Sequence, residues 1–265
     1  MKLHKLRPRD GWRVFVGEVG VIVLGVLIAL IAQQIAENWQ WRQTVARTKA
    51  DLEDQIHAAI ANSVERAAVD PCLSQRLSEL ANRVAASRGE WKGDPYYLPG
   101  EVTSKEIVHY AVPRVYRTPQ RDFPDDVWQQ AKAGGALSHM TPADIALYAD
   151  AFANIGALRS SIIPENELQA ELSFLAFDGP LGSSERARAL STISQLDTIN
   201  RQTLNTARLL VDNAKALGGT LSAADEKMLF DYLDIQREFR GHCVDRAATL
   251  RLIAPIRASG ATRVR

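Results

Sequence analysis

Residues 14 to 35 form an apolar run, VFVGEVGVIVLGVLIALIAQQI. The 19 residues from Val14 to Ala32 contain one charged residue, Glu18. An α-helix of this length crosses the roughly 30 Å hydrocarbon core of a bilayer. The run therefore predicts a transmembrane helix at 14–35, with the lipid bilayer as its first partner.

A cleaved signal peptide also pairs a basic start with an apolar run, and this alternative stays open. The apolar core of a signal peptide has about 7 to 15 residues and ends at a site with small side chains. The run here is longer, and the nearest candidate sites, at 29–31 and 34–36, fit that pattern poorly. We favour a retained anchor.

Basic residues are concentrated before the apolar run. Five of them lie within residues 1–13, whereas the first base after the run is Arg42. Because cytoplasmic flanks carry the excess of Lys and Arg, we expect a cytoplasmic basic segment at 1–13 and a periplasmic domain at 36–256. We expect a helix over 44–69 to lift this domain clear of the headgroups, and a disordered tail at 257–265.

One face of the predicted anchor carries small residues and a single acid. At 100° per residue, these residues fall within about 60° of one another, and we call them the anchor seam: Glu18, Gly25, Ala29, Ala32 and Ala36. Small residues let membrane helices approach closely, so the seam predicts self-association or contact with another membrane protein. In the alternative, Gly and Ala are simply common in such helices, and Glu18 reaches water unaided.

Three short motifs follow one another along the anchor: Gly17-Glu18, the run Gly-Val-Leu-Ile-Ala-Leu at 25–30, and Asn38-Trp39. In these motifs the anchor resembles the N-terminal segment of a bacterial family of uncharacterised membrane proteins. The resemblance covers about 30 of the 265 residues. It implies a single-pass protein of the bacterial inner membrane.

The charge balance argues against one class of partner. The chain has 32 basic and 31 acidic residues, of which 27 and 29 follow residue 35. Nucleic-acid binding needs a basic surface, so we expect no nucleic-acid partner. The apolar content of 46% is sufficient for one anchor and one domain with its own core.

The two cysteines, Cys72 and Cys243, both follow the anchor. In an oxidising compartment an even pair predicts a disulfide bond. Two buried and unpaired thiols, which behave as small apolar side chains, are the alternative.

Apolar residues recur at helical spacing through most of the exported part. Helix starts are indicated at Asp70-Pro71, Thr141-Pro142 and Ser222–Asp225, and helix ends at Gly134-Gly135 and Gly218-Gly219. Short turns favour antiparallel neighbours. The sequence therefore predicts an all-α fold, with the transmembrane helix followed by an antiparallel helical bundle. We expect one helix to end before Pro71, and Pro164 to kink or divide a later helix.

One long connection, at 89–123, is rich in proline and tyrosine. Connections of this length are often functional, and its aromatic and basic residues predict a binding surface. These residues are Trp91, Tyr96, Tyr97, Tyr110, Arg114, Tyr116 and Arg117. The alternative is a strap whose aromatic side chains fill gaps across the bundle.

Residues suited to chemistry do not converge in the sequence. The histidines are dispersed, without the spacing of a metal site. The densest acidic group consists of Glu165, Glu167 and Glu171. We interpret it as part of the solvated surface rather than as a catalytic site. We therefore predict no catalytic residue, no cofactor and no metal site.

These patterns favour a membrane-anchored periplasmic scaffold or interaction protein. The alternative is a bundle that senses a small-molecule ligand and acts through a membrane partner, because a cytoplasmic segment of 13 residues is too short for a transmitter domain. An enzyme is the third hypothesis.

Replacing Glu18 and Gly25 together by leucine should weaken association through the anchor seam, because bulky side chains keep helix backbones apart. Chemical crosslinking of the full chain in membranes measures this association. Unchanged crosslinking would show that the seam has no role.

Overall fold

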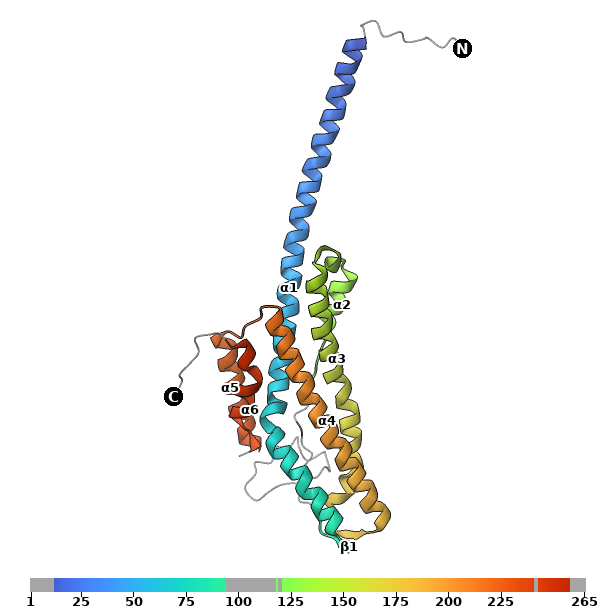
Figure 1. Cartoon of the computed structure of the whole chain (residues 1–265), viewed down its shortest axis with the longest axis vertical. Helices are drawn as coiled ribbons and strands as arrows, with labels where there is room; N and C mark the ends of the chain where they lie inside the picture. Colours follow the sequence, from blue (N-terminus) through green and yellow to red (C-terminus); the bar gives the residue numbers. More distant parts are fainter. Residues whose placement is uncertain (1–11, 94–117, 119–120, 241–242, 258–265) are drawn as a thin grey trace, which may run out of the picture.

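The computed structural model of the chain describes residues 12–93, 118, 121–240 and 243–257. Its longest element is helix α1 (Trp12–Ala86), whose 75 residues span roughly 110 Å at 1.5 Å per residue. The first part of α1 stands alone, and the rest runs through a bundle (Figure 1). The most apolar 18-residue stretch of α1 has no residue buried inside the molecule. The predicted all-α fold with an N-terminal transmembrane helix is confirmed.

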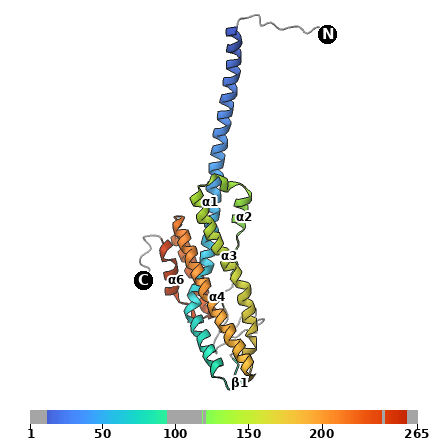
Figure 2. The same ribbon diagram turned by 45° about the vertical axis from the view of Figure 1, so that its right-hand side comes forward.

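The other elements build the bundle around the second half of α1. In chain order they are β1 (Gly89–Trp91), α2 (Asp126–Ala133), η3 (Ala136–His139), α3 (Pro142–Glu171), η4 (Ser173–Ala176), β2 (Gly179–Leu181), α4 (Ser183–Ala216), α5 (Ala223–Arg240), α6 (Arg246–Ile253) and η6 (Ala254–Ile256). Helix α4 runs antiparallel to both α1 and α3 (Figures 1 and 2). The antiparallel pair β1–β2 lies at the end of the bundle farthest from the N-terminus.

The bundle begins close to the predicted anchor. The Trp41 ring of α1 stacks on the His139 ring of η3, with centroids 4.0 Å apart. Trp41 is six residues beyond Ile35, the last residue of the predicted span. Helix α1 runs unbroken over the predicted range 44–69, and packing against it already starts at Trp41. The expected clearance of the bundle from the headgroups stays a prediction.

Two helix starts follow the predicted capping chemistry. At the start of α3, the Thr141 hydroxyl accepts a hydrogen bond of 3.1 Å from the Asp144 amide, and Pro142 is the first helical residue. Before α5, the Ser222 hydroxyl accepts from the Asp225 amide over 3.1 Å, and the Asp225 carboxylate accepts from the Ser222 amide over 3.0 Å. This is a capping box with Asp in place of Glu.

The prediction that a helix ends before Pro71 is wrong, because α1 continues through this residue to Ala86. A proline inside a helix costs roughly 3 kcal/mol. Beyond it, four apolar side chains of α1 are buried in the bundle: Leu73, Leu77, Leu80 and Val84. Burial of each such side chain contributes about 1.5 to 3 kcal/mol, which outweighs the cost of the proline. Helix α3 likewise passes through Pro164 without being divided.

Buried apolar residues form two separate cores along the bundle. The anchor-side core includes Leu52, Ile56, Ile60, Tyr148, Phe152, Ile155 and Leu210. The distal core includes Leu73, Leu77, Leu80, Leu172, Leu175, Leu181 and Ile193. Along α1, the first core ends at Ala68 and the second begins at Leu73.

The C-terminal end of the bundle extends slightly further than predicted. Arg257, expected in the disordered tail, donates a hydrogen bond of 3.1 Å from Nε to the Glu226 carboxylate of α5. This ion pair and the backbone bridge between Leu221 and Arg257 explain why the folded part includes Arg257. The remainder of the predicted tail, 258–265, lies outside the described residues.

Cys72 of α1 and Cys243, between α5 and α6, are at disulfide-bonding distance, with Cα atoms 5.2 Å apart. They are separated by 171 residues in sequence. Close by, the Asp245 amide donates a hydrogen bond of 2.7 Å to the Ala68 carbonyl. The predicted pairing therefore agrees with the fold, which holds the C-terminal helices against α1 at this point.

Replacing Cys243 by serine should lower the free energy of unfolding of the bundle by up to about 5 kcal/mol, because the crosslink closes a long loop. Urea unfolding of the oxidised full chain in detergent, followed by circular dichroism, measures the loss. Under reducing conditions the variant and the parent should agree within about 1 kcal/mol. Mass spectrometry that finds both thiols free in the unreduced parent chain would contradict the prediction.

Candidate functional site

A layer of buried polar side chains lies between the two cores. Arg66 of α1, Glu165 of α3 and Asn200 of α4 are 4%, 5% and 1% exposed. Arg66 donates from Nη1 to the Glu165 carboxylate over 2.8 Å and from Nη2 to the Asn200 amide oxygen over 3.1 Å. The Asn200 amide nitrogen then donates to the Asp70 carboxylate over 2.6 Å. We call these four residues the polar layer.

Helix geometry explains how the polar layer is assembled. Arg66 and Asp70 are four residues apart on α1, so they lie on one face, one turn apart. Asn200 contacts both of them because its amide is a donor on one side and an acceptor on the other. The guanidinium uses two of its nitrogens in these bonds, and its Nε has no partner in the part of the chain that the structure describes.

The polar layer specifies one alignment of α1, α3 and α4. A buried charge without a partner is costly, and removing one member of a buried ion pair costs roughly 3 to 5 kcal/mol. Sliding one helix by a turn would move Arg66 away from Glu165 and place it against an apolar core. The layer therefore penalises other registers of the three long helices.

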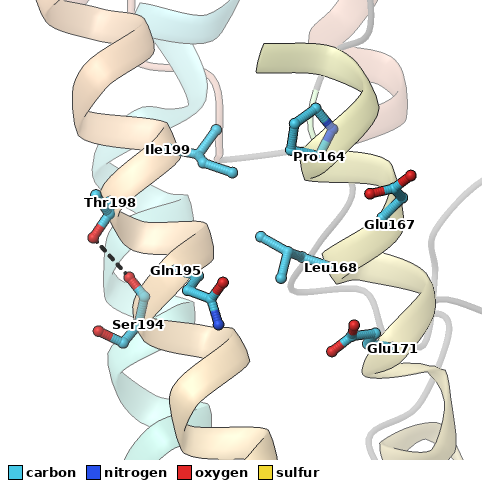
Figure 3. Close-up of a pocket in the computed structure, with 8 residues that line it drawn as sticks. All are labelled: Pro164, Glu167, Leu168, Glu171, Ser194, Gln195, Thr198 and Ile199. Carbon is cyan, nitrogen blue, oxygen red and sulfur yellow. Dashed lines mark hydrogen bonds between the residues drawn. The ribbon is translucent and has the colours of Figure 1, made fainter. Parts of the chain in front are cut away.

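A cleft of about 460 Å³ opens between α3 and α4 beside the polar layer. Figure 3 shows Leu168 and Pro164 of α3 pointing toward Ile199 of α4 across the cleft. The polar side chains around this apolar floor are Glu167, Glu171, Ser194, Gln195 and Thr198. Glu171 accepts a hydrogen bond from Thr192 over 3.2 Å and lies 3.9 Å from Arg188. The Glu167 carboxylate beside the apolar floor therefore suits a partner that presents a cationic group next to an apolar one.

A second cleft, of about 360 Å³, opens between α1, α4 and α6. Its charged lining consists of Asp70 from the polar layer, Arg208 and Asp212 of α4, and Arg251 of α6. Pro71 lines this cleft, as Pro164 lines the first one. Both clefts therefore open next to a proline of a long helix at the level of the polar layer.

The shifted pKa values belong to contacts away from the polar layer. A hydrogen bond from Arg159 of α3 lowers the pKa of Asp125, before α2, to about 2. Burial raises the pKa of Tyr148, whose hydroxyl donates to Glu53 over 3.0 Å. These contacts join α2 to α3 and α3 to α1.

Of the residues predicted for a binding surface, Trp91 is the one within the described part of the chain. Trp91 is buried, and its indole nitrogen donates to the Leu175 carbonyl over 2.8 Å. Its place in the distal core matches the alternative, in which aromatic side chains fill gaps. The six others lie outside the described residues: Tyr96, Tyr97, Tyr110, Arg114, Tyr116 and Arg117.

The anchor seam and the acidic group, the other candidates from the sequence, lie in different parts of the molecule. Every member of the anchor seam is exposed along the free part of α1. The acidic group is split, because Glu165 turns inward to Arg66 whereas Glu167 and Glu171 line the first cleft. Across the described residues, no three side chains of metal-binding type gather at one point.

The chain matches no protein-family model, no curated protein and no solved structure. The resemblance of the anchor to a bacterial family therefore stays a prediction.

The sequence reasoning missed the polar layer, although α1 contains a signal for it. Ala59, Ser63, Arg66 and Asp70 follow one another at spacings of four, three and four. They extend one face of the apolar stripe, so an arginine on that face indicates a buried charge that needs a partner. The identity of the partners on α3 and α4 depends on tertiary packing.

Replacing Arg66 by alanine should lower the free energy of unfolding by roughly 3 to 5 kcal/mol, because Glu165 is left buried without its partner. The double change Arg66→Met with Glu165→Leu should recover much of this loss, since no charge is left buried. Urea unfolding of the full chain in detergent measures both.

The matched control is Arg201→Ala, one residue from Asn200. Arg201 pairs with Asp197 over 3.0 Å at the surface, so its loss should cost no more than about 1 kcal/mol. An Arg66→Ala cost no larger than that of the control would show that the layer does not fix the bundle.

Proposed function

We propose that this chain is a membrane-anchored helical scaffold that holds an interaction domain at the surface of the bacterial inner membrane. Residues 1–13 lie in the cytoplasm in this proposal, and the bundle lies in the periplasm. The basic flank before the apolar run supports this orientation. The proximity of Cys72 and Cys243 supports an oxidising compartment.

The observation that carries the proposal is that anchor and bundle share one helix. Helix α1 is exposed over its apolar part and contributes to both cores over its second half. A partner bound to the bundle is therefore held at a fixed height above the membrane, with no loose linker between them. Such rigid tethering suits a scaffold that gathers proteins at one membrane position.

The bundle offers a surface for such a partner in the α3–α4 cleft. The cleft combines the apolar floor of Leu168 and Ile199 with the carboxylates of Glu167 and Glu171. Its lining residues all belong to α3 and α4, so the cleft stays accessible while the first part of α1 is in the bilayer.

A photo-crosslinking residue placed at Gln195, in the cleft of the full chain, should give a discrete adduct with one membrane or periplasmic protein. The control position is Lys227, which is exposed on α5 away from the cleft. Equal labelling from both positions, or none from Gln195, would contradict the proposal.

A reporter enzyme fused to Arg265 should be active in the periplasm, and cytoplasmic activity would contradict the orientation.

A second candidate function, ligand sensing through a membrane partner, is favoured by the cleft between α1, α4 and α6. This cleft contains Asp70 of the polar layer, so a bound molecule would act on the contacts that align α1. A thermal shift of several degrees of the full chain with one class of metabolite would rank sensing above scaffolding.

A further inference from the structure

The end of the bundle nearest the anchor is formed by the turns around η3. We call residues 132–141 the membrane-proximal cap, because this segment packs against α1 next to the apolar run (Figure 2). The Trp41 and His139 rings stack at 4.0 Å with an angle of 18° between their planes. The stack fixes the height of the cap along α1.

The position of this stack along α1 can be compared with the thickness of the lipid headgroup layer. Trp41 follows Ile35 by six residues, which corresponds to roughly 9 Å along a helix axis. The headgroup layer on each side of the hydrocarbon core is about 5 to 8 Å thick. With the span ending at Ile35, the cap would lie at the outer edge of that layer, and the Ser138 and His139 side chains of the cap are exposed.

We infer that the membrane-proximal cap docks on the lipid headgroup surface, with a preference for anionic headgroups. Trp39 is 63% exposed between the apolar run and the cap, at the depth where indole rings concentrate in membrane proteins. The partner of this surface is the same bilayer that holds the anchor, because the cap packs on α1 directly after the apolar run.

The charges near the cap favour anionic lipids. Arg42 of α1 and Lys132 of α2 are exposed at this end of the bundle. The nearby acid Asp144 bonds Lys49 over 2.7 Å, and this hydrogen bond lowers its pKa, so the two charges neutralise each other. Glu37 is the acid adjacent to the apolar run, and it accepts a hydrogen bond from Gln33. The exposed bases thus outnumber the acids, and each base near an anionic surface adds to the attraction.

The inference rests on the anchor of the proposed function but does not involve a protein partner. It makes the bundle a surface-bound domain with a fixed tilt, because the anchor and the cap are two separate contacts with the bilayer. A bundle that touched the membrane only through α1 would be free to tilt with that helix.

Nitroxide labels on the full chain in vesicles test the contact, using Ser138→Cys in the cap, Ser184→Cys at the opposite end of the bundle and Leu27→Cys in the anchor. In vesicles with anionic and zwitterionic phospholipids, the Ser138 label should be several-fold less accessible to a water-soluble nickel chelate than the Ser184 label. Equal accessibility of these two labels, with the Leu27 label deep in the bilayer, would overturn the inference and leave the anchor intact. A Leu27 label that the chelate reaches would overturn both.

Charge reversal tests the lipid preference. The pair Arg42→Glu with Lys132→Glu should expose the Ser138 label in anionic vesicles, whereas Arg201→Glu with Lys227→Glu, the same change of charge elsewhere on the bundle, should not. Purely zwitterionic vesicles should also expose the label of the parent chain. Protection that is equal in both kinds of vesicle would overturn the assignment to anionic headgroups.

Discussion

Two environments act on one helix, and the rest of the structure depends on how α1 satisfies both. An α-helix bonds its own backbone polar groups, so the same element is stable in hydrocarbon and in a protein interior. Over its first part α1 exposes apolar side chains in every direction, as a lipid-facing helix does. Over its second half the apolar stripe narrows to the faces covered by α3, α4 and α6. The position of the bundle relative to the bilayer follows from this single element.

Within the bundle, apolar burial and charge pairing have separate roles. The two cores supply most of the stabilisation, because burial scales with apolar area. The polar layer between them contributes alignment, since Arg66 has one partner on α3 and another on α4. Both surface clefts lie beside this layer and next to a proline. A molecule bound in either cleft would therefore lie next to the polar layer, whose residues set the register of the helices.

Much of the fold could be predicted from the sequence, because its signals are local. Apolar spacing indicated the helices, and the capping residues at Thr141 and Ser222 marked two helix starts. The predicted helix end at Pro71 was wrong, because it considered only the local cost of a proline. The burial of the leucines that follow Pro71 depends on tertiary packing and outweighs that cost. The α3 and α4 partners of Arg66 were not predictable, since Glu165 and Asn200 are 99 and 134 residues away in sequence. The clefts depend on the same packing and have no local signal.

A disulfide between Cys72 and Cys243 would enclose most of the bundle in one loop. Helices α2, α3, α4 and α5 all lie between the two cysteines in the chain. A protease that cuts once at any turn among these helices would leave two pieces joined through sulfur, and both would stay attached to the membrane. In an oxidising compartment, a nicked copy would thus keep its place at the bilayer rather than shed its C-terminal half.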